Sequence, residues 1–136
     1  MMKDPEIAEL LKNAKTIAVV GLSSNPARAS FGVARFLQRQ GFRIIPVNPN
    51  ETEVLGEKAY GALSAVPDEV DIADVFRRPD QVDAVVDDAI KAGIRYLWLQ
   101  EGIVNHEAAK RAEQNGISVV MDRCILKELA RLFTQR

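Results

Sequence analysis

The chain has 136 residues, 47% hydrophobic and 27% charged, which is the composition of a soluble globular protein. Its length predicts one domain, residues 1–136, and its formal net charge of −1 gives no reason to expect nucleic acid or an anionic membrane as a partner. One cysteine and one histidine exclude an internal disulfide and a His/Cys zinc site, and the absence of a signal peptide or apolar span adds to the expectation of a cytoplasmic protein.

The first predicted element is a helix in which Asp4 is the N-cap and Pro5 takes the first helical position. Apolar residues follow at helical spacing, which indicates a helix packed on a sheet, without chemistry of its own. They are Ile7, Ala8, Leu10, Leu11 and Ala14.

Short apolar runs then alternate with amphipathic stretches, a pattern typical of βαβ units and a parallel sheet. The predicted strands are residues 16–20, 70–76, 95–99 and 117–121, together with a second strand contained in residues 42–49. Pro46 is interpreted as the end of that second strand. The predicted helices are residues 30–40, 81–92, 106–115 and 123–133, the last three capped by Asp80, Asn105 and Asp122. The expected buried stripe of the second of these helices is Val82, Val85, Val86 and Ile90. The fold class is therefore α/β, a Rossmann-like doubly wound parallel sheet in the order 3-2-1-4-5 with helices on both faces.

Residues 15–32, KTIAVVGLSSNPARASFG, combine a buried strand, a glycine turn, a polar loop and a helix start. Free N–H groups and the positive end of a helix dipole converge on an anion in such a layout, which predicts a phosphate site. The dinucleotide pattern G-x-G-x-x-G fails because Ser23 stands two residues after Gly21, and no Gly-Lys-Ser/Thr occurs. An ordinary turn in which Ser30 caps the helix is the alternative interpretation.

In an open parallel sheet the ligand lies across the carboxyl ends of the strands at the switch point. The segments that follow the predicted strands are residues 21–32, 48–50, 76–79, 100–102 and 122–124. An acidic residue that would hold the ribose of NAD is missing after the second strand, where Asn48 and Pro49 stand and Glu51 is expected beyond a turn. This counts against ordinary NAD binding.

Together these strand ends resemble the CoA-binding domain family, which includes the nucleotide-binding half of the succinyl-CoA synthetase α subunit and short stand-alone bacterial and archaeal proteins. The matching segments are GLSSNPARASFG, PVNPNE with LGEKAY, VDIADVFRRPD, LWLQEGIVN and VVMDRC, which span nearly the whole chain. The resemblance implies a Rossmann-like fold that binds CoA, with the diphosphate on the loop after the first strand and the adenosine near the ends of the second and third.

Carried over by position, the resemblance implies which residues bind the cofactor. Those expected to meet phosphate are Gly21, Ser23, Ser24, Arg28 and Ser30. Those around the nucleotide are Asn48 and Pro49, which would shape the pocket, and Phe76, Arg77 and Arg78, which would line its adenosine side. The two arginines are candidates for a 3′-phosphate, or else solvated side chains at a strand end. The phosphohistidine domain and nucleotide-grasp subunit of the synthetase have no counterpart here, so its reaction is not carried over.

Two further residues are candidates for chemistry, although none is assigned as catalytic. Cys124 follows Arg123 at a predicted helix start, which suggests a mixed disulfide with CoA; a small residue packing the last helix is the favoured alternative. Glu101 is either a general base near the pantetheine end or part of a strand-end turn, the favoured interpretation. His106 is expected to be a polar first-turn residue and Trp98 to lie in the core.

The sequence therefore predicts non-catalytic binding of CoA or an acyl-CoA, in a carrier, sensor or thiol-protecting role. One alternative is an NAD(P)-linked oxidoreductase, against which the missing second glycine and the absence of a Tyr-x-x-x-Lys pair argue. Another is the nucleotide-binding subunit of a split acyl-CoA synthetase. No nucleic acid, membrane or metal is expected, and a homo-oligomer is left open.

Overall fold

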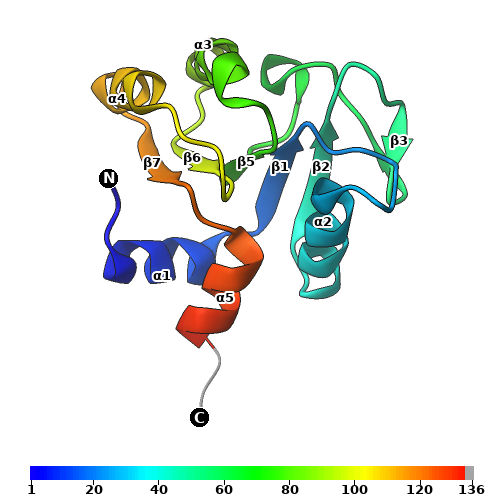
Figure 1. Cartoon of the computed structure of the whole chain (residues 1–136). Coiled ribbons are helices and arrows are strands. Elements are labelled where there is room, and N and C mark those ends of the chain that lie inside the picture. The colour runs from blue at the N-terminus through cyan, green and yellow to red at the C-terminus, as the bar shows by residue number, and fades with distance from the viewer. Residues whose placement is uncertain (134–136) are drawn as a thin grey trace.

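The computed structural model describes residues 1–133 and is built around a parallel sheet (Figure 1). The five strands of this sheet are β1 (Thr16–Val20), β2 (Arg43–Val47), β5 (Ile72–Val75), β6 (Tyr96–Leu99) and β7 (Ser118–Met121). A small antiparallel hairpin, β3 (Glu53–Val54) and β4 (Glu57–Lys58), lies beside the edge strand β2. The predicted α/β class with a parallel sheet of five strands is confirmed.

Helices cover both faces of the sheet, as expected for a doubly wound fold. The helices α3 (Val82–Ala92) and α4 (His106–Gln114) lie on one face, and α1 (Asp4–Asn13), α2 (Ala29–Arg39) and α5 (Ile125–Phe133) lie on the other (Figure 1). Single 3-10 turns form at η1 (Leu63–Ala65) and η2 (Pro79–Gln81). Each face of the sheet packs against its helices in a separate hydrophobic core. Successive strand residues point to opposite faces, so that Ala18 faces α3 and α4 whereas Val19 faces α2 and α5.

The strand order is β2-β1-β5-β6-β7, which is 2-1-3-4-5 when the sheet's strands are numbered along the chain, so the predicted order 3-2-1-4-5 is wrong. Pro46 supplies the physical reason. It lies inside β2 and not at its end, and a proline is tolerated within a strand that forms the edge of a sheet. The Val47 carbonyl accepts from Gly21 on the β1 side, whereas the Pro46 carbonyl accepts from Tyr60 on the open side. The correct order moves the switch point to the carboxyl ends of β1 and β5.

The helix starts differ from the sequence predictions at several caps. The N-cap of α1 is Lys3, and Asp4 lies in the first turn. Gln81 is the N-cap of α3, because Asp80 belongs to the preceding 3-10 turn. Ile90 of α3 is 37% exposed and does not join the buried stripe, where Ala89 takes its place.

Only the cap of α4 is as predicted: the Asn105 side chain accepts from the Ala108 N–H at 3.0 Å. The last helix, α5, starts at Ile125, because Asp122 adopts a left-handed φ of 63° and cannot begin a helix. The Asp122 carboxylate accepts instead from the N–H of Gly102, at 2.7 Å.

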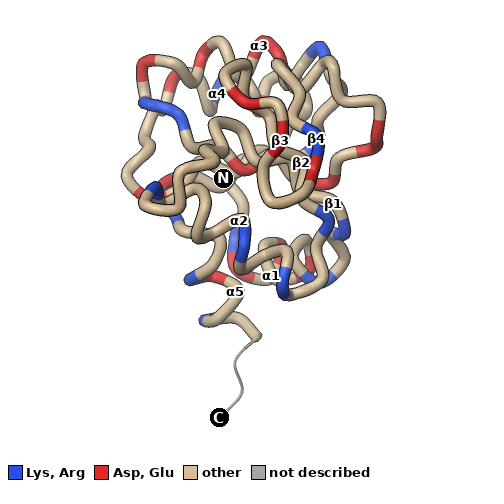
Figure 2. The backbone as a smooth tube through the Cα atoms, turned by 90° about the vertical axis from the view of Figure 1, so that its right-hand side faces the viewer, with Lys and Arg blue, Asp and Glu red and all other residues tan. Residues whose placement is uncertain are grey.

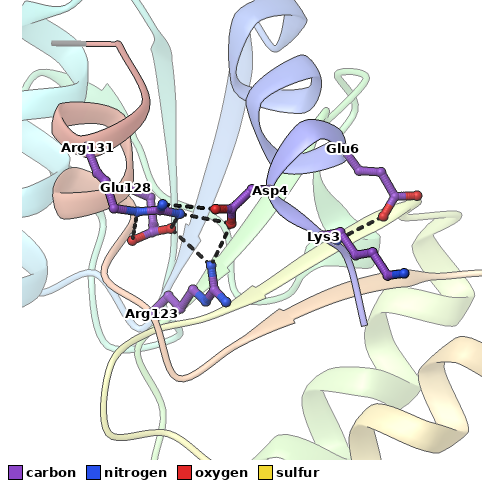
Figure 3. Close-up of polar contacts among 6 residues, drawn as sticks. All are labelled: Lys3, Asp4, Glu6, Arg123, Glu128 and Arg131. Atoms are coloured by element: carbon purple, nitrogen blue, oxygen red, sulfur yellow. Dashed lines mark hydrogen bonds and ion pairs between the residues drawn. The ribbon is translucent and has the colours of Figure 1, made fainter. Parts of the chain in front are cut away.

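A network of charged side chains joins the first helix to the last (Figure 3). Arg131 of α5 donates to Asp4 of α1 at 2.9 Å and to Glu128 at 2.7 Å, and Arg123 contacts both acids at longer distances. The hydrogen bonds from Arg131 are the main cause that lowers the pKa of Asp4 and of Glu128. The network therefore holds α1 against α5 while both carboxylates are ionised.

Elsewhere the surface carries both signs of charge, and Figure 2 shows Lys and Arg interspersed with Asp and Glu. Among residues 1–133, no helix combines the length and the apolar character needed to cross a membrane. The same residues contain no group of three or more His, Cys, Asp or Glu side chains placed to hold a metal ion.

Candidate functional site

The switch point begins at Gly21, where β1 passes close to the end of β5. Gly21 has a φ of 88°, and a Cβ on it would collide with the carbonyl oxygen of Phe76 and lie 3.5 Å from Cδ of Arg77. The Phe76 N–H in turn donates to Val20 at 2.8 Å. Glycine is therefore required both for the backbone conformation and for space, and the close approach brings the Arg77 side chain to the start of the loop.

The loop after β1 is held by two serine hydroxyls, one in the loop and one at the start of α2. The buried Ser30 hydroxyl accepts from the Ser23 N–H at 3.1 Å, and the Ser23 hydroxyl accepts from the N–H of Asn25 at 3.0 Å. Arg28, and not Ser30, is the N-cap of α2, so the alternative interpretation of Ser30 as a cap is wrong. Within residues 1–133, the N–H groups of Ala29 and Ser30 have no acceptor, as is usual for a first helical turn, and they leave donors for an anion.

The segment after β2 closes onto this loop. The Asn48 side chain is 8% exposed, donates to the carbonyl of Leu22 at 3.0 Å and accepts from the N–H of Asn50 at 3.0 Å. The turn brings Glu51 back, so that its carboxylate accepts from both the N–H (2.9 Å) and the hydroxyl (3.0 Å) of Ser24. Sequence reasoning missed this contact; the Asn-Pro-Asn turn that produces it was the available signal.

The three arginines that are predicted to bind the cofactor differ in their surroundings. Arg77 is half-buried beside Gly21, and Arg28 is exposed at the start of α2. Neither forms an ion pair with any residue from 1 to 133, whereas the exposed Arg78 lies 3.5 Å from Asp80. Two arginines without an ion-pair partner among the described residues therefore lie at the ends of the loop after β1, with Cδ of Arg77 beside Gly21 and Arg28 at the start of α2.

The remaining residues predicted to surround the nucleotide lie at the same edge of the sheet. Phe76 is half-buried and packs against the core beneath α2 and α5, and Pro49 is exposed beside Asn48. The predicted residues in contact with the loop after β1 are thus Asn48, Phe76 and Arg77, while Pro49 and Arg78 lie around it on the surface.

The ends of β6 and β7 form a second polar area. Buried Gln100 accepts from the N–H of Ile125 at 3.1 Å and so caps α5. Exposed Glu101 pairs with Lys127 at 2.9 Å, and this hydrogen bond raises the pKa of Lys127. Half-buried Cys124 lines a cavity of about 390 Å³ together with Glu101 and Lys127, and it packs against the core. This packing agrees with the favoured interpretation of Cys124. The mixed disulfide with CoA is a hypothesis, which an intact mass measured after incubation with oxidised CoA would test.

Trp98 and His106 lie where the sequence predicted. Trp98 is fully buried in β6, and its indole N–H donates to the carbonyl of Arg123 at 2.7 Å. His106 is exposed in the first turn of α4.

Asp74, in the middle of β5, is a buried acid that sequence reasoning did not select. It is fully buried between Val19 of β1 and Trp98 of β6, and neither carboxyl oxygen has a hydrogen-bond partner among residues 1–133. Desolvation raises its pKa well above the usual range for aspartate. An acid within an otherwise apolar strand was the available signal. Asp74 lies two residues before Phe76 in the chain, and therefore close to the carboxyl end of β5, where the switch point lies.

A larger cavity, of about 930 Å³, lies at the opposite edge of the sheet. Its lining includes Ala14, Val70, Tyr96 and Ser118, which precede or begin strands. Because ligands of open parallel sheets bind at the carboxyl ends of the strands, the loop after β1 remains the candidate site despite the greater volume of this cavity.

Comparison with known proteins agrees with this geometry. Residues 15–130 match a family described as CoA binding domain, a range that includes the loop after β1 and every strand of the sheet. The chain belongs to the CoA-binding domain family. The resemblance inferred from the strand-end segments is thereby confirmed.

Relatives of two kinds are similar to this CoA-binding domain. The uncharacterized protein YneT of Bacillus subtilis is 42% identical over 120 residues, which cover 88% of this chain and 89% of YneT. A solved structure from Thermus thermophilus, cell-free ID.343, is 40% identical with a TM-score of 0.93 and covers 97% of this chain and 100% of its own. ADP-forming acetate–CoA ligase II of Archaeoglobus fulgidus is 32% identical over 101 residues, which are 73% of this chain but only 15% of the ligase.

Proposed function

We propose that this protein binds CoA or an acyl-CoA at the switch point, as one CoA-binding domain without a catalytic step of its own. The observation that carries the proposal is the anion-binding arrangement of the loop after β1. Ser23 and Ser30 tie the loop to the start of α2, and Arg77 reaches its base beside Gly21. Membership in the CoA-binding domain family supports CoA as the nucleotide.

The charges around the loop match a diphosphate. Free N–H groups at Ala29 and Ser30, together with the helix dipole of α2, would bind phosphate oxygens. Arg28 and Arg77 would neutralise the negative charge, since neither has an ion-pair partner within the described residues 1–133. The adenosine would lie over the ends of β2 and β5, between Asn48 and Phe76, with Arg78 on its outer side. Binding of this kind suits a carrier, a sensor or a protector of the CoA thiol.

The nucleotide-binding subunit of a split acyl-CoA synthetase is a second candidate. It is supported by the similarity to the acetate–CoA ligase, of which this chain spans 15%. Under this alternative the protein would copurify with a partner that supplies the rest of a ligase, and ligase activity would appear only when both are present.

Calorimetric titration with CoA, with NAD and NADP as controls, tests the proposal. We expect micromolar binding of CoA, roughly −8 kcal/mol, and loss of that binding in the Ser23→Ala/Arg28→Ala variant. The matched control is Ser64→Ala/Arg39→Ala, which removes the same kinds of side chain from η1 and the far end of α2. Binding of NAD or NADP without binding of CoA would reject the proposal in favour of the oxidoreductase alternative.

A further inference from the structure

One carboxylate of the chain already occupies donors of the loop after β1. Both the N–H and the hydroxyl of Ser24 donate to the same oxygen, Oε2 of Glu51, at 2.9 and 3.0 Å. Ser24 is exposed and Glu51 is half-buried, so this contact lies at the surface of the protein, where a ligand can reach it. A phosphate oxygen would make the same two hydrogen bonds, because carboxylate and phosphate oxygens are both charged acceptors.

We propose that Glu51 fills a phosphate subsite at Ser24, competes with the ligand for that subsite and is displaced when the diphosphate of the nucleotide binds. This inference rests on the proposed function, since it assigns Ser24 to the diphosphate. Glu51 thus weakens, by the same amount, the binding of every ligand that carries a phosphate at this position.

The surroundings of Glu51 make displacement feasible. Its carboxylate forms no ion pair with any residue between 1 and 133, and Ser24 supplies its side-chain hydrogen bonds. The preceding turn is held separately, by the bonds of Asn48 to Leu22 and to Asn50. The side chain can therefore rotate towards solvent while the backbone after β2 stays in place. A phosphate oxygen and the Glu51 carboxylate compete for the same two donors of Ser24, and like charges repel at contact distance.

Titration of the Glu51→Gln variant with CoA and with 3′-dephospho-CoA tests the proposal. Glutamine keeps an acceptor for Ser24 but removes the charge, so we expect both ligands to bind about tenfold more tightly than to the unaltered protein. The gain should be equal for the two ligands, because they share the diphosphate. The control is Glu53→Gln, an exposed residue of β3 two positions away, which should leave both affinities unchanged.

Three results would overturn the proposal. Unchanged affinity would show that Glu51 does not compete with the ligand, and weaker binding would show that it holds the ligand. A gain for CoA alone would place Glu51 beside the 3′-phosphate and not the diphosphate.

Failure of the proposed function is distinguishable from these results, because then neither ligand would bind even the unaltered protein. In that case a titration with inorganic pyrophosphate, followed at the Ser24 amide resonance by NMR, tests the subsite itself. The proposal requires the resonance to shift at a lower pyrophosphate concentration in Glu51→Gln than in the unaltered protein, and equal concentrations would reject it.

Discussion

Gly21 packs against the backbone carbonyl of Phe76 so closely that no side chain fits between them. A Gly21→Ala substitution would add a steric collision to the strain of a positive φ. We therefore expect the free energy of unfolding to fall by about 1–3 kcal/mol or more. Urea denaturation measures this change in the free energy of unfolding. The control is Gly32→Ala in α2, where a Cβ meets nothing within 4 Å; it should stabilise by about 0.5–1 kcal/mol. Equal midpoints for Gly21→Ala and the unaltered protein would contradict the close approach.

The buried carboxyl of Asp74 should make stability depend on pH. Desolvation raises its pKa in the folded state above the unfolded value, so the folded protein binds the extra proton. Stability should therefore be fully present at a pH below the unfolded value of about 4 and should fall, by up to about 1.4 kcal/mol per pH unit, as pH rises towards the folded pKa. The Asp74→Asn variant lacks this dependence. Denaturation of both proteins between pH 4 and pH 8 should show a difference that grows with pH, and parallel curves would refute it.

Glu128 should contribute to the stability of the fold in the opposite pH range from Asp74. Its pKa is lowered chiefly by the hydrogen bond from Arg131, so its stabilisation is present at neutral pH and is lost as pH falls below about 4. We expect Glu128→Gln to cost about 1–2 kcal/mol at pH 7, because the side chain is largely buried between two arginines. Glu101→Gln, which breaks only an exposed pair with Lys127, is the control and should have little effect. A Glu128 effect that persists unchanged at pH 3 would show that it is not electrostatic.

The start of α4 depends on one side chain. Asn105 accepts from the Ala108 N–H and also donates to the carbonyl of Pro79 at 3.0 Å, linking α4 to η2. We expect Asn105→Ala to reduce the unfolding free energy by about 1 kcal/mol or more, as measured by thermal or urea denaturation. His106→Ala, at the next and exposed position, should change it by less than about 0.5 kcal/mol. Equal losses in the two variants would contradict a specific capping role.

The sequence by itself determined the features that depend on neighbouring residues. The apolar run of residues 16–20 forms β1, the Asn105 cap opens α4, and the polar segment after Gly21 lies at the carboxyl end of β1. Periodicity and capping act within a few residues, so they can be inferred from a single chain. The same local patterns carried the resemblance to the CoA-binding domain family.

Only the tertiary structure decided the relationships between residues far apart along the chain. Pro46 was consistent with a strand end or an edge strand, and only the pairing of β5 with β1 showed which was correct. Likewise, the contact of Glu51 with Ser24 and the isolation of Asp74 depend on elements brought together by packing. Strand order and burial are set by the packing of the whole sheet and its helices, and no short stretch of sequence records that packing.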